Sequence, residues 1–136
     1  MMLDVDFFKQ YNDTYGHLEG DKALIYVAKC LLSIFKRPGD FVFRLGGEEF
    51  GVFLTDTDAQ ESEALADKIC HSLEDQEIPH EKNQASKYLT ISIGVVSCVG
   101  DETLDEEDLL KQADKKLYEA KESGRNRYVM SYGVAS

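Results

Sequence analysis

The sequence contains no long apolar run. Its longest apolar stretches are only a few residues long, whereas a membrane-spanning helix needs about 20 consecutive apolar residues. The chain start, Met1 to Asp4, does not open a basic and then an apolar segment, so we expect no signal peptide. From these absences we expect a cytoplasmic segment that makes no membrane contact.

Cysteine is scarce, and its spacing argues against two kinds of site. The three residues, Cys30, Cys70 and Cys98, are widely separated and odd in number. Without a Cys-x-x-Cys pair, neither a zinc site nor a disulfide framework is expected. We interpret the cysteines as buried free thiols in a reducing compartment.

Positive charge is also in short supply. The chain has 15 Lys and Arg residues against 26 Asp and Glu residues, a net charge of −11, and no basic cluster. A nucleic-acid surface needs lysine and arginine to displace counterions from phosphates, so we expect no nucleic-acid partner. An acidic protein still binds a small phosphate ligand where local cations, a metal ion or backbone amides neutralise it.

The residues that are present indicate one α+β domain over residues 1–136. The length suits a single domain, 43% of the residues are hydrophobic, and no internal repeat or linker interrupts the chain. Apolar spacing and turn residues predict the order β-α-β-β-α-β-α-β. The first six elements match the ferredoxin-like arrangement, in which helices flank a mostly antiparallel sheet.

The expected elements follow from periodicity and from breaker residues. Strands are expected at residues 3–8, 41–45, 50–54, 89–95 and 128–132. Helices are expected at 21–37, over a stretch that carries Leu65, Ile69 and Leu73 after a cap at Thr57 or Asp58, and from the cap Asp105 to Ser123. The segments 9–20 and 76–87 are expected to be polar connections.

Three clusters of polar residues are candidates for chemistry. Asp4 and Asp6 lie two apart on a strand, so both carboxylates point to one face and suit Mg²⁺. The alternative is that one of them caps the following turn. Taken alone, this pair is weak evidence for a metal site.

The second cluster is the hairpin tip at residues 46–49. Its two glycines allow a ligand to approach the backbone closely, and Glu48 and Glu49 could then reach a metal ion or a hydroxyl group. A plain solvated turn is an equally good interpretation, although Asn-Gly would make a better one.

The third cluster is Lys121 and Arg125, in the last turn of the third helix and just beyond it. Favourable charge at the negative end of the helix dipole explains them by itself. The functional alternative is a clamp on terminal phosphates, which arginine binds in a fork.

Taken together, the three clusters resemble the GGDEF family. The order and the spacings match from residue 3 to residue 131, and the active-site signature has its Gly-Gly-Glu-Glu-Phe form at residues 46–50. The motifs that carry the resemblance run from Asp4 to Asp21, from Arg44 to Phe50 and from Ala120 to Asn126.

The resemblance implies a diguanylate cyclase with a nucleotidyl-cyclase palm-like fold. In this family each domain holds one GTP, and two copies meet face to face. Each 3′-hydroxyl attacks the α-phosphate of the other GTP, which gives cyclic di-GMP and two pyrophosphates. The implied cofactor is Mg²⁺, or Mn²⁺ in its place, and the implied partners are GTP, cyclic di-GMP and a second copy of the domain.

The resemblance also implies roles for single residues. Asp4 and Glu48 match the metal ligands, helped by the carbonyl of Val5, and Glu49 is either a further ligand or the base for the 3′-hydroxyl. The GTP site would comprise Lys9 with the amides around Phe7 and Phe8 at the phosphates, Gly46 and Gly47, Asn12 and Asp21 at the guanine, and Lys121 and Arg125 at the β- and γ-phosphates. Asp6 and His17 match positions that we interpret as structural.

A second site is implied by Arg37 and Asp40, which match the family's RxxD product-inhibition motif. Taken alone, this pair would be a surface ion pair of little energetic worth. The family also carries a helix and an Asp-x-Leu-Thr turn before its first strand, and from their absence we expect a domain shortened at its N-terminus. A non-catalytic module that binds cyclic di-GMP or GTP is therefore the alternative function, and an interaction domain without a nucleotide is a third.

Overall fold

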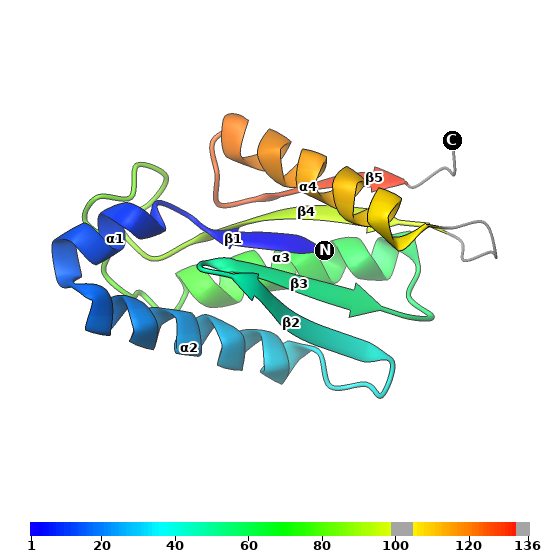
Figure 1. Cartoon of the computed structure of the whole chain (residues 1–136), viewed down its shortest axis with the longest axis horizontal. Coiled ribbons are helices and arrows are strands. Elements are labelled where there is room, and N and C mark those ends of the chain that lie inside the picture. The colour runs from blue at the N-terminus through cyan, green and yellow to red at the C-terminus, as the bar shows by residue number, and fades with distance from the viewer. Residues whose placement is uncertain (99–104, 133–136) are drawn as a thin grey trace.

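The computed structural model describes residues 1–98 and 105–132. It has a five-stranded sheet in the order β2-β3-β1-β4-β5 (Figure 1). The elements are β1 (Met2–Val5), α1 (Phe8–Tyr15), α2 (His17–Ile34), β2 (Asp40–Gly46), β3 (Glu49–Leu54), α3 (Ala59–Glu74), β4 (Ile91–Ser97), α4 (Glu106–Glu122) and β5 (Tyr128–Tyr132).

The sheet is mostly antiparallel, so the expected α+β fold class is confirmed. The central strand β1 pairs antiparallel with both β3 and β4, and β2 and β3 form a hairpin. Only β4 and β5 run parallel. Leu3 in β1 lies between Phe50 and Ile93 of its neighbours, and all three side chains are buried in the main core.

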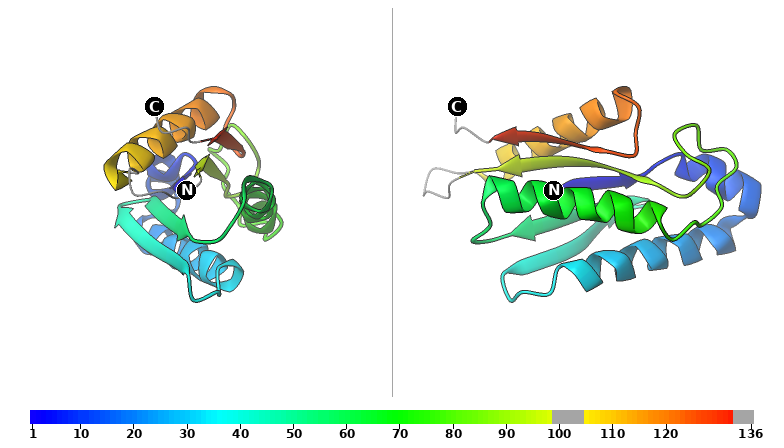
Figure 2. Two further views of the ribbon diagram at one scale, coloured as in Figure 1. Left: turned by 90° about the vertical axis from the view of Figure 1, so that its right-hand side faces the viewer. Right: turned by 180° about the vertical axis from the view of Figure 1, so that it is seen from behind.

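Helices cover the two faces of the sheet unequally. On one face α2 and α3 pack over the main core, and on the other face α4 lies across β4 and β5 (Figures 1 and 2). Gly94 lets α4 approach closely, because a Cβ there would lie 2.0 Å from the carbonyl oxygen of Ala113. Met2, on the same face, packs against Ala113 and Leu117.

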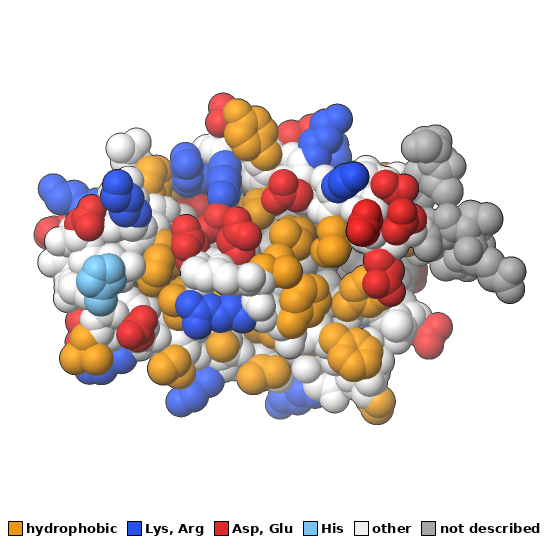
Figure 3. Space-filling view, in the orientation of Figure 1, with side chains coloured by type: hydrophobic (Ala, Val, Ile, Leu, Met, Phe, Trp, Pro, Cys, Tyr) orange, Lys and Arg blue, Asp and Glu red, His pale blue; other side chains and the backbone are white. Residues whose placement is uncertain are grey.

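The part of that second face formed by β2 and β3 exposes large apolar side chains. Gly51 in β3 pairs with both Met2 and Phe43, and the pair Phe41–Phe53 lies two positions further along the hairpin. Because side chains alternate along a strand, Phe41 and Phe53 lie on the same face as Met2. Phe41 is 58% exposed, and hydrophobic side chains gather over β2 and β3 in the space-filling view (Figure 3). An apolar surface of this kind is a site where another segment or another molecule is able to pack.

The structure corrects the expectation for residues 3–20. The first strand ends at Val5, so Phe8 begins a helix, and the expected polar connection at residues 9–20 contains the rest of α1 and the start of α2. Phe8 and Tyr11 are buried on one side of α1, and Tyr11 packs on Tyr15 with 4.7 Å between ring centroids. This eight-residue helix depends on tertiary contacts rather than on propensity, which is why its sequence did not predict it.

The remaining elements differ from expectation mainly at their ends. Helix α2 ends at Ile34, before Arg37, and β4 begins at Ile91 rather than at residue 89. The caps are confirmed: Asp58 accepts from the Glu61 amide at 2.8 Å and Asp105 from the Glu107 amide at 3.0 Å.

The cysteines are free, as expected, although only Cys70 is buried and Cys30 and Cys98 are half-buried. No helix in the described part of the chain has the length and apolar character needed to cross a membrane.

Candidate active site

Strand register brings the acidic residues of two motifs together. Asp4 in β1 lies directly opposite Glu49 in β3, and the amide of Val5 donates to the carbonyl of Glu48 at 3.3 Å. Residues that face each other in an antiparallel pair project from the same side of the sheet. The carboxylates predicted at the strand and at the hairpin therefore form one cluster.

A lysine from the far end of the chain balances this cluster. Lys121, in the last turn of α4, donates a hydrogen bond to the Oδ2 atom of Asp4. Asp4 is only 6% exposed, and burial raises its pKa to about 6. The charge of Lys121 lowers that pKa, and Glu48 and Glu49 raise it. The charged form of Asp4 is therefore disfavoured by burial and by the neighbouring glutamates, and a cation bound there would stabilise it.

The cluster fits Mg²⁺ better than a metal held by protein ligands alone. In residues 1–98 and 105–132 no group of three or more His, Cys, Asp or Glu side chains is arranged to hold a metal ion. Mg²⁺ commonly takes one or two carboxylates and completes its coordination with water and substrate phosphates. Asp4, Glu48 and the carbonyl of Val5 are hard oxygen donors of the type that Mg²⁺ prefers.

The hairpin tip leaves room for a ligand. Gly46 has φ +150° and Gly47 has φ +51°, and a Cβ built on either would meet nothing within 4 Å. The register of β2 and β3 shifts between Arg44 and Gly46, and Arg44 Nε donates to the carbonyl of Gly47 at 2.9 Å. The hydrogen bond from Arg44 therefore anchors the turn, and the two glycines leave space for a ligand beside it.

Two strained turns form a cationic surface beside the carboxylates. Phe7, the residue before α1, has φ +52°, and Arg125, just after α4, has φ +63°. The Arg125 guanidinium lies 4.4 Å from the centroid of the Phe7 ring, a cation–π contact. Within residues 1–98 and 105–132 no side chain caps α1, and no acidic residue lies in its first turn, so its N-terminal amides are available to an anion.

The buried side chain of Asp6 connects the turn at Phe7 with the turn that carries Arg125. It is 2% exposed and accepts hydrogen bonds from Thr90 Oγ1 at 2.8 Å, from Ser92 Oγ at 2.6 Å and from the Asn126 amide at 3.0 Å. Burial raises the pKa of Asp6, and these hydrogen bonds and Arg125 lower it. Its contacts are all internal, which agrees with the structural role expected for it.

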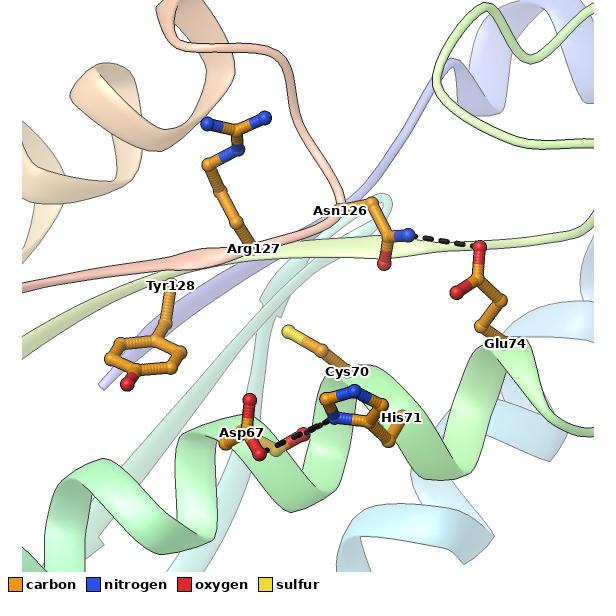
Figure 4. A pocket seen from close by; sticks show the side chains of 7 residues that line it. All are labelled: Asp67, Cys70, His71, Glu74, Asn126, Arg127 and Tyr128. Carbon is orange, nitrogen blue, oxygen red and sulfur yellow. Dashed lines mark hydrogen bonds and ion pairs between the residues drawn. The ribbon is translucent and has the colours of Figure 1, made fainter.

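Asn126 is held from a second side. Its Nδ2 atom donates to Glu74 at the end of α3 at 2.9 Å, at one end of a small pocket of about 150 Å³ between α3 and β5 (Figure 4). In the same pocket Asp67 pairs with His71, away from the carboxylate cluster. The hydrogen bond between Asn126 and Glu74 therefore helps to fix the loop that carries Arg125. The pocket itself adds no group to the site.

The predicted guanine-reading residues lie along α1 and α2. Asn12 Oδ1 is buried and has no hydrogen-bond partner among the described residues, and a Cβ on Gly20 would lie 1.7 Å from it, so a larger residue there would displace the Asn12 side chain. Asp21 is exposed near the start of α2 and lines a groove of about 500 Å³ between α2 and the hairpin. Leu24 and Phe50 supply part of the groove's apolar lining.

Arg37 and Asp40 lie apart from all of this, at the opposite end of β2 from the glycine turn. Asp40 accepts from the Arg37 amide at 3.1 Å, and the two side chains approach to 3.6 Å. Arg37 Nη2 also donates to the carbonyl of Thr55 at 3.1 Å and to Thr57 Oγ1. The pair closes a turn, and the Arg37 side chain stays 52% exposed.

Most of the residues predicted for the nucleotide site therefore gather at one end of the sheet, and the Arg37 pair does not join them. Sequence reasoning missed the stacking of Phe7 on Arg125 and the contact of Lys121 with Asp4. It also passed over His80, whose ring nitrogen bonds the carbonyl of Phe7. A histidine in a polar connection gave no signal of this contact.

The fold and the site define an α+β domain in which an acidic cluster lies beside the turns that carry Phe7 and Arg125. The family model "Diguanylate cyclase, GGDEF domain" matches residues 1–127, and the chain belongs to the GGDEF family.

Curated relatives agree with this assignment. The chain is 44% identical over 131 residues to diguanylate cyclase A of Treponema denticola and 40% identical over 130 residues to the probable diguanylate cyclase DgcT of Escherichia coli. Each alignment covers 96% of this chain but only 34% and 28% of the relatives. The chain thus spans about a third of the length of these proteins.

Solved structures agree as well. The GGDEF domain of DgcB from Caulobacter crescentus, in complex with c-di-GMP, superposes with a TM-score of 0.82 at 28% identity, over 95% of this chain and 74% of that one. The active GGEEF domain of a diguanylate cyclase from Vibrio cholerae gives a TM-score of 0.81 at 30% identity, over 98% and 81%.

Proposed function

We propose that this chain is a diguanylate cyclase domain that joins two GTP molecules into cyclic di-GMP and releases two pyrophosphates. The observation that carries the proposal is the register that sets Asp4 opposite Glu49, with Lys121 on the same carboxylate. The names of its relatives and the GGEEF form of its hairpin point the same way.

The metal and the phosphates would share the acidic cluster. Mg²⁺, or Mn²⁺ in its place, would be held by Asp4, Glu48 and the carbonyl of Val5, and when bound it neutralises charge that develops on the phosphates. Glu49 would be either a further ligand or the acceptor of the 3′-hydroxyl proton. Lys121, which bonds Asp4, would then be able to bind a phosphate as well.

The phosphates would lie on the cationic turns. Arg125, held over the Phe7 ring, carries a planar fork of donors that suits a phosphate. The free amides around Phe7 and Phe8 and the exposed Lys9 at the start of α1 add further positive potential. These groups bind and orient the triphosphate, which is most of what a phosphoryl-transfer enzyme must do.

The guanine would enter the groove beside α2. Asp21 accepts hydrogen bonds only, so it suits the N1–H and N2–H₂ donors of guanine and not the edge of adenine. The unpaired Oδ1 of Asn12 offers a second contact. Each chain would hold one GTP in this groove, so the cyclic product would require two copies that face each other.

The direct test is a product assay. The chain is incubated with GTP and Mg²⁺, and cyclic di-GMP and pyrophosphate are measured together. We expect a ratio of one to two and a turnover per chain that rises with chain concentration, because two copies must meet. Absence of cyclic di-GMP at high chain concentration would contradict the proposal.

The second candidate is a binding module that holds cyclic di-GMP without making it. The observation in its favour is the exposed apolar face around Phe41 and Phe53, which an active domain would be expected to cover. In that case cyclic di-GMP binds at Arg37 and Asp40 while GTP is not converted. We propose the same pair as the product-inhibition site of the active enzyme.

A further inference from the structure

His80 is a buried titratable residue that the proposed chemistry does not use. It lies in the connection between α3 and β4, and its side chain is 0% exposed. Its Nε2 atom lies 3.0 Å from the carbonyl oxygen of Phe7, 73 positions away in the sequence. The ring also meets Tyr11 edge to face, with 5.1 Å between the ring centroids.

The hydrogen-bond partners fix the state of the ring. A carbonyl oxygen only accepts, so Nε2 carries the hydrogen and donates it to Phe7. The other nitrogen, Nδ1, is buried and has no hydrogen-bond partner in the described part of the chain, and burial lowers the pKa of His80. The side chain is therefore a neutral donor aimed at the Phe7 carbonyl.

That backbone atom belongs to a strained turn at the phosphate end of the site. Phe7 has φ +52°, a conformation that a bulky residue adopts only when its surroundings enforce it. Its carbonyl also accepts the Tyr11 amide at 3.0 Å, which closes the first turn of α1. His80 donates to the same oxygen from a separate segment, the connection between α3 and β4.

The segment that carries His80 is itself anchored. The His80 amide donates to the carbonyl of Lys87 at 2.9 Å, and Asn83 Nδ2 donates to Thr90 Oγ1 at 2.9 Å. Thr90 in turn donates to Asp6, the residue before Phe7. His80 is thus a fixed support and not a mobile side chain.

We propose that His80 is a positioning residue for the triphosphate. Its hydrogen bond to the Phe7 carbonyl keeps the turn in place, and with it the free amides at the start of α1 and the ring on which Arg125 stacks. The inference rests on the proposed function for the identity of the nucleotide. It concerns the phosphates alone, so guanine recognition by Asp21 is independent of it.

The test compares two replacements of His80. His80→Leu removes the donor at similar volume, and His80→Gln keeps an amide nitrogen that can reach the Phe7 carbonyl. His71→Leu, on the exposed side of α3, is the matched control. Affinities are measured with Mg²⁺ for α,β-methylene GTP, for inorganic tripolyphosphate and for guanosine, and thermal unfolding reports the fold.

We expect His80→Leu to weaken binding of the GTP analogue and of tripolyphosphate about tenfold, the worth of one hydrogen bond. Guanosine binding should not change, and His80→Gln should restore most of the loss. In the His80→Leu background Arg125→Ala should cost less than in the parent chain, because Arg125 has already lost its fixed support. If His80→Leu does not fold, His80→Met replaces it.

Equal loss for all three ligands, or no loss for tripolyphosphate, would overturn the inference. So would a His80→Gln variant that is as weak as His80→Leu. A parent chain that binds tripolyphosphate but not guanosine would contradict the proposed function alone, because the comparison of His80 variants with tripolyphosphate would still decide the role of His80.

Discussion

Charged residues near the two ends of β2 are held in different ways. At the glycine end, Asp4 is 6% exposed and bonds Lys121, 117 positions away, while Asp6 bonds the Asn126 amide, 120 positions away. At the other end, Arg37 stays half exposed and bonds Asp40, three positions away, and Thr55, 18 positions away.

This difference separates an assembled site from a local turn. Buried charges that depend on distant segments lose several contacts when one residue is changed, because each partner is left unsatisfied. In the Arg37 turn the partners are close in sequence and the Asp40 side chain is only 4% exposed, but the half-exposed Arg37 guanidinium is free to exchange its partner for a ligand. We therefore expect large, coupled effects at the glycine end and small, ligand-specific effects at the Arg37 end.

The largest effect is expected from Glu48→Gln. The change removes a charge from the acidic cluster while preserving shape, so turnover of GTP with Mg²⁺ should fall by about a thousandfold. Thermal unfolding should match the parent chain. Glu61→Gln, on the exposed side of α3, is the control. Normal turnover in Glu48→Gln would mean that the metal assignment is wrong.

The next effect is on stability and comes from Asp6. Asp6→Ala leaves Thr90, Ser92 and the Asn126 amide without an acceptor, so the free energy of unfolding should fall by about 2–4 kcal/mol. Asp6→Asn should lose less, because an amide oxygen still accepts from Asn126. Urea unfolding measures both. Arg37→Ala should lower the unfolding free energy by only about 1 kcal/mol, because Asp40 keeps its hydrogen bond from the residue 37 amide; equal losses at the two ends would remove the distinction between them.

Base selectivity sharpens the comparison within the glycine end. The parent chain should bind GTP at least about a hundredfold better than ATP, because a site built for hydrogen bonds rejects a base that leaves them unmade. Asp21→Ala should erase that preference, and Asp13→Ala, exposed on α1, should keep it. Competition binding with both nucleotides gives the ratio. A parent chain that binds ATP and GTP equally would refute the guanine assignment.

The smallest effect is expected at the Arg37 end. Arg37→Ala should weaken cyclic di-GMP binding about tenfold and leave GTP binding nearly unchanged, because seven-residue β2 separates the two sites. Calorimetry with each ligand decides this, with Lys36→Ala as the neighbouring control. Loss of both ligands together would show that the sites are not separate. Unchanged cyclic di-GMP binding would leave Arg37 as a surface charge.

Much of the fold could be read from local patterns. Alternation of apolar residues marked β4, three- and four-residue spacing marked the long helices, and Asp58 and Asp105 capped two of them as expected. These signals are local, so no knowledge of the fold was needed to interpret them. The short helix α1 was missed because Phe8 and Tyr11 give too brief a pattern, and burial against other elements decides its conformation.

The site, like the fold, has features that local sequence predicts and features that only tertiary contacts decide. The sequence by itself determined which residue types are available, from the paired aspartates through the Gly-Gly-Glu-Glu turn to Lys121 and Arg125. Only the tertiary structure decided that Asp4 faces Glu49, that Lys121 bonds Asp4 and that His80 supports Phe7. Each of these contacts joins segments more than 40 residues apart, and their geometry comes from strand register and helix packing, which no local pattern specifies.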